Sequence, residues 1–239
     1  MHLFLIEYIA GWKSKLGLAL IVGNLGTGKT LILTILAMLE LEDNKKVYST
    51  YHIKYVASNG NTAQFVDAGD LLTYFREQEE SFIPNSSCLM VDEGYLGTDS
   101  RQSSSSANKL MTDFVLQSRH FGLDLYFCVQ LASTIDKRIR KLIDARVLAE
   151  KLWRKTVGDD GNEKLEPMFK YTYMSASGET GNLQFSNENV SEIYPQYDHM
   201  EIVEAPMISL DHRIAVRTKK LLTDSSIKKR RKMKITIKR

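Results

Sequence analysis

Short apolar runs alternate with longer helical patterns along the first 150 residues of the chain. Such runs occupy residues 18–22, 88–91 and 125–129, and a polar or glycine-containing segment follows each of them. Between the first two, residues 30–41 are apolar on nearly every side, which predicts a buried helix. Alternation of strands and helices favours an α/β fold, with a mostly parallel sheet that is covered on both faces.

The remaining elements have less regular patterns. We expect strands over 46–51 and 146–149, and helices after Asp70, over 110–119 and over 137–143. From residue 151 the pattern changes, because strand-like segments at 152–157 and 168–174 flank a turn at 158–161. This arrangement predicts a β-hairpin appended to the sheet. Residues 175–227 match no single pattern.

Length and composition indicate one domain of ordinary globular type. The chain has 239 residues, of which 43% are hydrophobic and 26% charged. We expect a single domain over 1–223, with its core at about 14–150 and a hairpin and extension over 151–223, followed by a basic tail at 224–239. Cys88 and Cys128 lie in apolar runs, which is typical of buried thiols in a reduced protein rather than of a disulfide or a zinc site.

Charge is distributed unevenly along the chain. The net charge is +3, and residues 228–239 contain eight basic and no acidic residues, which leaves −5 (3 − 8) on residues 1–227. Basic residues that neutralise phosphates add affinity for nucleic acid independently of sequence. The alternatives for the tail are a solvated end, a localisation signal or a contact with an anionic membrane. No apolar run approaches the ~20 residues of a membrane span, so no transmembrane segment is expected.

The strongest motif follows the first apolar run and matches GxxxxGK[ST] without a mismatch. Its residues are Gly23, Asn24, Leu25, Gly26, Thr27, Gly28, Lys29 and Thr30. Glycines let backbone N–H groups turn inward around phosphates, and the start of the following helix adds its positive dipole end. Lys29 is expected to reach the β- and γ-phosphates of a nucleotide, and Thr30 to offer its hydroxyl to Mg²⁺.

A second motif combines four apolar residues with two acids, Asp92 and Glu93, at residues 88–93. A buried strand of this kind would deliver both carboxylates to the phosphate end of the sheet. Asp92 is then expected to hold Mg²⁺ through water, and Glu93 to polarise the attacking water. The alternative is a strand that ends in a solvated acidic turn. The GxxxxGK[ST] motif, known as a P-loop, ends 62 residues upstream of Asp92 and favours the catalytic pair.

Two further residues are candidates for roles in hydrolysis. Gln130 ends the run 125–129, and strand ends of this kind face the ligand crevice of α/β sheets, so it could contact the γ-phosphate or the attacking water. Arg119 could act as an arginine finger on the nucleotide of a neighbouring subunit. The alternatives are a polar residue where a strand leaves the core, and a cation favoured by the dipole at a helix end.

The chain resembles the HerA/FtsK superfamily of P-loop ATPases in the runs 88–93, 118–124, 129–130 and 135–140. Within it, the likeness is to viral genome-packaging ATPases and to the Zot-like ATPases of filamentous phage. Residues 194–201 are similar to a Tyr-Asp-Thr-x-Glu element of such proteins, with His199 in place of the threonine. The resemblance implies a RecA-like sheet, a catalytic Glu93, a sensor Gln130 and an arginine finger at Arg119 in a hexameric or pentameric ring.

Residues and resemblance together predict an ATP-hydrolysing DNA translocase, with ATP and Mg²⁺ as cofactors, that drives double-stranded DNA into a preformed viral capsid. Its expected partners are that DNA, further copies of the chain, and capsid or virion membrane proteins, in the host cytoplasm or on the virion. A Zot-like ATPase of virion assembly at a membrane is the alternative, and the lack of a transmembrane segment counts against it. A third hypothesis is a nucleotide-binding regulator without motor activity, and the presence of Glu93 and Gln130 argues against it.

Overall fold

The computed structural model describes residues 9, 11–12, 17–67, 83, 86–92, 112, 114–120, 122–157 and 162–198. Within them the strands are β1 (Leu18–Val22), β2 (Val47–Ser49), β3 (Gln64–Phe65), β4 (Cys88–Val91), β5 (Asp124–Val129), β6 (Ala145–Val157), β7 (Glu163–Ser175) and β8 (Thr180–Ser186). The helices are α2 (Lys29–Glu42), η2 (Ala132–Thr134), α5 (Lys137–Arg140), α6 (Asn187–Val190) and η3 (Tyr194–Gln196), and residues 114–118 are also helical. None of the helices in these ranges is long and apolar enough to cross a bilayer. The predicted helix after Asp70 and the basic tail lie outside the described residues.

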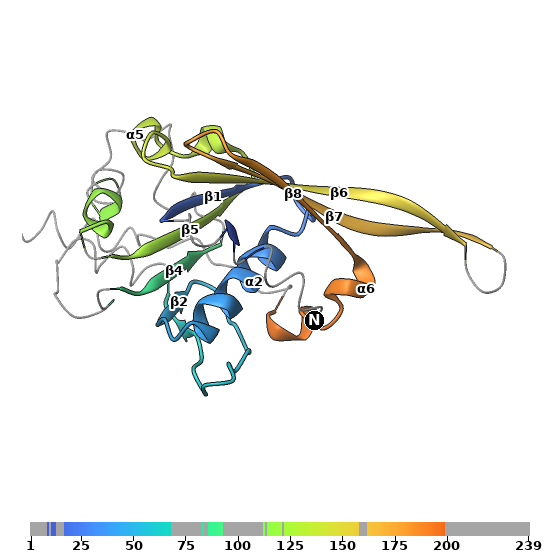
Figure 1. Ribbon diagram of the computed structural model, residues 1–239, viewed down its shortest axis with the longest axis horizontal. Coiled ribbons are helices and arrows are strands. Elements are labelled where there is room, and N and C mark those ends of the chain that lie inside the picture. The colour runs from blue at the N-terminus through green and yellow to red at the C-terminus, as the bar shows by residue number, and fades with distance from the viewer. Residues whose placement is uncertain are drawn as a thin grey trace, which may run out of the picture. The chain divides into compact units, whose positions relative to one another are not determined.

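The strands form one sheet in the order β3-β2-β4-β5-β1-β6-β7-β8 (Figure 1). Pairs within the stretch from β3 to β6 are parallel, whereas β7 and β8 continue the sheet in antiparallel fashion. The predicted mostly parallel α/β sheet is confirmed. Because β5 lies between β1 and β4, the carboxyl ends of these three strands meet at one edge of the sheet.

Each face of the parallel half is buried by its own hydrophobic cluster. Alternate residues of β1 point to opposite faces. Ala19 and Ile21 join the cluster that contains α2, while Leu18 and Leu20 join the cluster that contains Ile139 of α5. In Figure 1, α2 lies on one side of the sheet and α5 on the other. Burial on both faces explains why β1 reads as a continuous apolar run.

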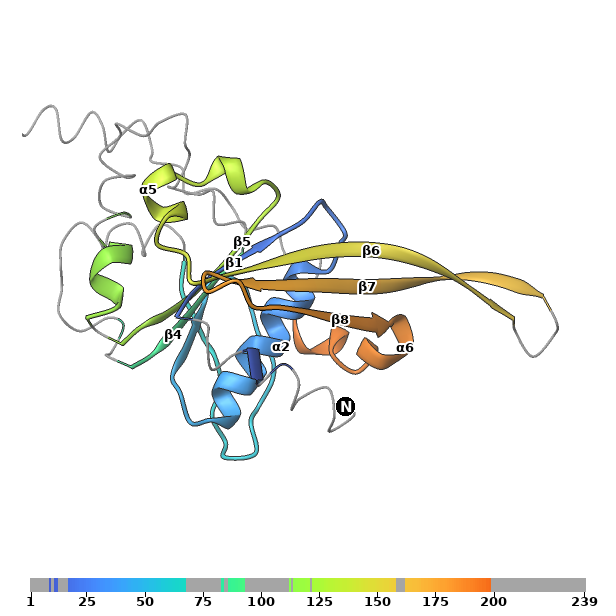
Figure 2. The same cartoon turned by 45° about the horizontal axis from the view of Figure 1, so that its top comes forward.

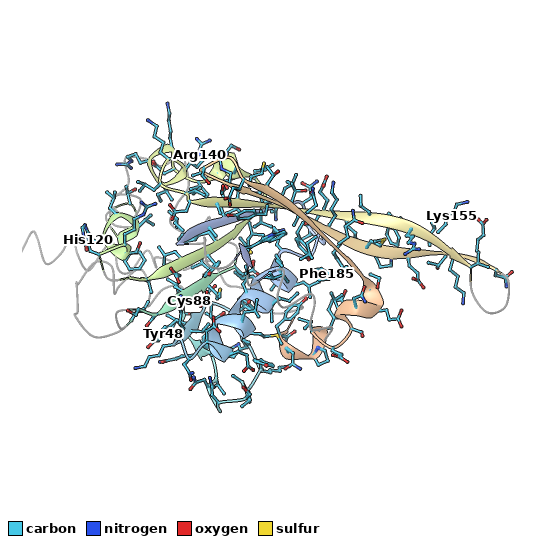
Figure 3. All side chains as sticks on the ribbon, in the orientation of Figure 1. Tyr48, Cys88, His120, Arg140, Lys155 and Phe185 are labelled. Carbon is cyan, nitrogen blue, oxygen red and sulfur yellow. The ribbon has the colours of Figure 1, made fainter. Side chains whose placement is uncertain are left out.

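The predicted β-hairpin is present and is longer than expected. β6 is one continuous strand of 13 residues, where the sequence predicts a strand over 146–149 and a separate one over 152–157. It pairs with β1 only as far as Leu148 but with β7 along its whole length, and β8 joins β7 only from Met168 onward. The distal part of the hairpin therefore extends past the sheet (Figure 2), and Lys155 lies on this part in Figure 3.

The final described segment, for which the sequence pattern predicts no helix or strand, returns to the core beside α2. After α6, the chain approaches the loop that follows β2. There the Lys54 backbone N–H donates to the Gln196 carbonyl oxygen at 2.7 Å, and Ile53 forms an antiparallel bridge with Tyr197. The Tyr197 ring also packs edge-on against Tyr51, with 6.5 Å between the ring centroids. These long-range contacts leave no periodic pattern in the local sequence.

Candidate functional site

The predicted phosphate-binding loop, residues 23–30, connects β1 to the beginning of α2. Gly26 and Gly28 have φ angles of 72° and 84°, in the left-handed region that glycine adopts without steric cost. Gly28 is the N-cap of α2, so the helix begins at Lys29. The positive end of a 14-residue helix is therefore directed at the loop, as binding of a phosphate requires.

Two glycines of the loop are in close contact with the β6–β7 hairpin. A Cβ atom on residue 23 would collide with the carbonyl oxygen of Ala149 on β6. A Cβ atom on residue 28 would lie 2.6 Å from the hydroxyl oxygen of Tyr171 and 2.7 Å from the ring of Phe169, both on β7. Glycine is needed at these two positions because neighbouring strands lie directly behind the loop, a reason that the motif itself does not contain.

The loop is closed by three hydrogen bonds to one acceptor, the carbonyl oxygen of Asn24. The Thr27 backbone N–H donates to it at 3.4 Å, the Thr27 hydroxyl at 2.8 Å and the Lys29 ammonium at 3.0 Å. Lys29 is thus held over the loop. A phosphate oxygen carries negative charge and the carbonyl oxygen does not, so the ammonium can transfer from this carbonyl to a nucleotide phosphate.

The structure brings the two predicted metal-binding residues together. The hydroxyl of Thr30, on α2, donates to Oδ2 of Asp92, directly after β4, at 2.6 Å, although the two residues are 62 apart in the sequence. Asp92 is buried, and its backbone N–H donates to the Thr50 hydroxyl at 3.0 Å, a positioning contact that sequence reasoning missed. A hydroxyl and a carboxylate both offer oxygen ligands, which Mg²⁺ prefers, and phosphates and water would complete its coordination shell.

Neutral, buried groups form the floor beneath this pair. The Cys128 thiol on β5 donates to the Lys29 carbonyl oxygen at 3.7 Å, and burial, with the nearby Asp92 charge, raises the pKa of this thiol well above its ordinary range. Burial likewise raises the pKa of Tyr51, whose hydroxyl lies 3.1 Å from that of Thr34. Both groups stay uncharged at neutral pH. The floor therefore screens Asp92 less than water would, which strengthens its attraction for a cation.

Of the two residues predicted to act on the attacking water, Gln130 lies within the described residues and Glu93 does not. Gln130 is exposed and directly follows β5, between the strand that leads into the P-loop and the strand that leads to Asp92. The backbone N–H of Gly23 donates to the Val129 carbonyl oxygen at 3.2 Å, which ties the start of the loop to this strand end. Glu93 directly follows Asp92 and lies outside the described residues.

Arg119 lies at the opposite end of the sheet from the phosphate-binding loop. Its guanidinium donates to the Leu142 carbonyl oxygen at 2.9 Å and to Oδ1 of Asp144 at 2.5 Å. Asp144 in turn accepts from the backbone N–H of Leu18, at the amino end of β1. The five residues of β1 separate this end from the P-loop by about 16 Å. The structure therefore does not bring Arg119 to the nucleotide site of its own chain.

Sequence comparison gives distant viral relatives. No protein-family model matches the chain. The uncharacterized protein ORF2 of Spiroplasma virus SpV1-R8A2 B is 28% identical over 133 residues, which are 55% of this chain and 37% of that protein. The ORF2 protein of Spiroplasma virus SpV1-C74 is 27% identical over the same length. The match thus spans little more than a third of the length of these relatives.

Comparison with solved structures gives the class of fold. The N-terminal domain of zonular occludens toxin from Neisseria meningitidis is similar with a TM-score of 0.51 and 16% identity, over 75% of this chain and 97% of that one. The genome packaging NTPase B204 of Sulfolobus turreted icosahedral virus 2, solved with ATP-gammaS, gives a TM-score of 0.48 and 13% identity over 70% and 96% of the two chains. The chain has the fold of a RecA-like P-loop ATPase, and the predicted resemblance to such ATPases is confirmed at the level of the fold.

Proposed function

We propose that the chain is an ATP-hydrolysing DNA translocase that acts on double-stranded viral DNA. The observation that carries the proposal is the 2.6 Å hydrogen bond between Thr30 and Asp92 beside a complete phosphate-binding loop. These side chains come from α2 and from the end of β4, and in the fold they meet at the edge where a nucleotide's phosphates would lie. A contact that only held the helix against the strand would not need a buried carboxylate at this edge, because apolar side chains could make it.

Each residue has a defined task in hydrolysis. Backbone N–H groups of the loop hold the phosphates, and Lys29 neutralises the charge between the β- and γ-phosphates. Thr30 and Asp92 would hold Mg²⁺, and the ion would supply positive charge to the phosphate oxygens. Glu93 accepts a proton from water as the water oxygen bonds to the γ-phosphorus and the bond from that phosphorus to the β–γ bridging oxygen breaks. Gln130 orients this water, and ADP and phosphate leave.

The placement of Arg119 supports action as a ring. Its guanidinium is about one strand length from the loop of its own chain, so an arginine finger at this position would act on the nucleotide of a neighbouring subunit. A ring of identical subunits gives every nucleotide such a neighbour. The eight basic residues at 228–239 provide the phosphate contacts that hold the DNA.

Two biological tasks are compatible with this motor. We place first the packaging of a viral genome into a preformed capsid. A Zot-like role in virion assembly at a membrane is the second candidate, and the fold likeness to the zonular occludens toxin domain favours it. The lack of a membrane helix within the described ranges does not separate the two, because the match covers little more than a third of the viral relatives. Co-purification from infected cells with capsids or with membrane distinguishes them.

The test is ATP hydrolysis by the full chain with and without duplex DNA. We expect hydrolysis that requires Mg²⁺ and increases with DNA. Asp92→Asn should lower turnover about 10- to 100-fold, as is usual when a group that orients a metal is removed. The matched control is Asp43→Asn, at an exposed aspartate, which should leave turnover unchanged. Hydrolysis that DNA does not stimulate would favour the non-motor regulator, and absence of nucleotide binding would reject the ATPase assignment itself.

A further inference from the structure

The hydroxyl of Tyr171 makes a direct hydrogen bond to the phosphate-binding loop. It donates to the carbonyl oxygen of Gly28 at 2.9 Å. The same carbonyl accepts the first hydrogen bond of α2, from the backbone N–H of Ile32 at 3.1 Å. Gly28 is both the last glycine of the loop and the N-cap of the helix, so the Tyr171 hydroxyl is bound to the point where loop becomes helix.

The Tyr171 ring is held by strands that do not belong to the loop. It is fully buried, and its strand β7 lies between β6 and β8, where Tyr171 pairs with Ala149 and Leu183. Its ring contacts Phe185 of β8 edge-on, with centroids 5.8 Å apart. The three antiparallel strands therefore determine where the hydroxyl lies, and the loop conforms to it.

Burial also keeps this hydroxyl a donor. Loss of contact with water raises the pKa of Tyr171 well above its ordinary value, so the phenol is protonated at neutral pH. A carbonyl oxygen offers an acceptor only, and the protonated phenol matches it. The bond is thus a contact between two neutral groups at neutral pH.

We propose that Tyr171 is a positioning residue for the phosphate-binding loop, whose hydroxyl fixes the Gly28 carbonyl and thereby the direction of the N–H groups that receive the phosphates. The inference rests on the proposed nucleotide-binding function of this loop. Peptide planes are rigid, so fixing the Gly28 carbonyl also fixes the N–H of Lys29 on the other side of the same plane. Removal of the hydroxyl takes away one of the two hydrogen bonds to the Gly28 carbonyl, at a left-handed glycine whose backbone can change conformation at little steric cost.

The test uses Tyr171→Phe, which keeps the ring and removes the hydrogen bond. Its matched control is Tyr173→Phe, on the same strand and the same face, because the Tyr173 ring is also buried and stacks on Trp12 at 5.3 Å. The first measurement is amide hydrogen exchange in the nucleotide-free full chain. We expect faster exchange confined to residues 24–30 in Tyr171→Phe and not in the control.

The second measurement is the affinity for Mg²⁺ and ATPγS. Loss of one neutral hydrogen bond that orders the site should raise the dissociation constant about 2- to 12-fold in Tyr171→Phe, with the control unchanged. Equal affinity and equal exchange in both variants would overturn the inference, and so would an increase in exchange spread over β1 and α2, because that marks general destabilisation. If the wild-type chain binds no nucleotide, the proposed function fails, while the exchange measurement still decides the role of Tyr171.

Discussion

The guanidinium of Arg119 lies 2.5 Å from the carboxylate of Asp144, and the same carboxylate accepts the backbone N–H of Leu18. This pair fastens the end of the helix at 114–118 to the start of β1. More than half of the Arg119 side chain is exposed, so the ion pair itself stabilises the fold by at most about 1 kcal/mol. Because the ion pair with Asp144 contributes little to stability, the Arg119 guanidinium can exchange it for another partner.

Arg119→Ala should therefore separate two roles. If Arg119 is a finger, the variant should bind ATP normally and hydrolyse it about 10³-fold more slowly, with little change in melting temperature. Asp144→Asn breaks the same ion pair but keeps the arginine, and it should retain hydrolysis. Mixed oligomers of Arg119→Ala and Lys29→Ala should regain activity, because one subunit supplies the loop and its neighbour the finger. No recovery in confirmed mixed oligomers would leave Arg119 as a structural cation.

Lys29 and Glu93 should fail at different steps. Lys29→Ala should abolish productive nucleotide binding, since the β- and γ-phosphates lose the ammonium that Asn24 holds over the loop. Glu93→Gln should still bind ATP and should slow hydrolysis about 10²- to 10⁴-fold, because the amide keeps the shape and loses the basicity. Equilibrium binding and single-turnover hydrolysis measure the two effects, with the exposed Lys54→Ala as control. Near-normal turnover in Glu93→Gln would remove it from the role of base.

The stability of α2 should depend on Lys45. Glu40 is fully buried in this helix, where it accepts from the Tyr126 hydroxyl at 2.7 Å and pairs with Lys45 at 3.2 Å. Lys45→Met should remove this cation both from Glu40 and from Asp124, with which Lys45 also forms an ion pair. The free energy of unfolding should fall by about 2–4 kcal/mol, somewhat below the value for a fully buried pair because Lys45 is one-third exposed. Urea titration measures it. The neighbouring exposed residue provides the control, Lys46→Met, for which we expect less than about 0.5 kcal/mol.

The basic tail should dominate the salt dependence of DNA binding. If about four of the eight charges at 228–239 contact phosphates, log affinity should fall with log salt at a slope of about −3 to −4 for duplex DNA. Deletion of the segment should flatten this slope and weaken binding alike for all sequences, while hydrolysis without DNA persists. A tail of the same length with glutamine at the eight positions separates charge from length. Identical slopes in all three proteins would assign the tail to another partner.

Local sequence was sufficient for the parts of this protein whose structure depends on near neighbours. The P-loop motif specifies its own turn, because Gly26 and Gly28 supply the two left-handed positions that start α2. The sequence predicts β1, β4 and β5 correctly, because burial on both faces of the sheet demands uninterrupted apolar runs. The hairpin was predicted in outline, but the continuity of β6 was not, since its residues after Ala149 are largely exposed and show no alternation.

Only the tertiary structure decided which distant residues meet. The order of the strands places Asp92 against Thr30 and puts Gln130 after β5, between the strand that leads into the loop and the strand that leads to Asp92. No local pattern encodes strand order. The contacts of Tyr171 with Gly28 and of Arg119 with Asp144 join residues 143 and 25 positions apart. Periodicity records how a residue relates to the solvent and to its immediate neighbours. A hydrogen bond across the sheet depends instead on how whole elements pack, and a single polar side chain leaves no trace of that partner in the sequence around it.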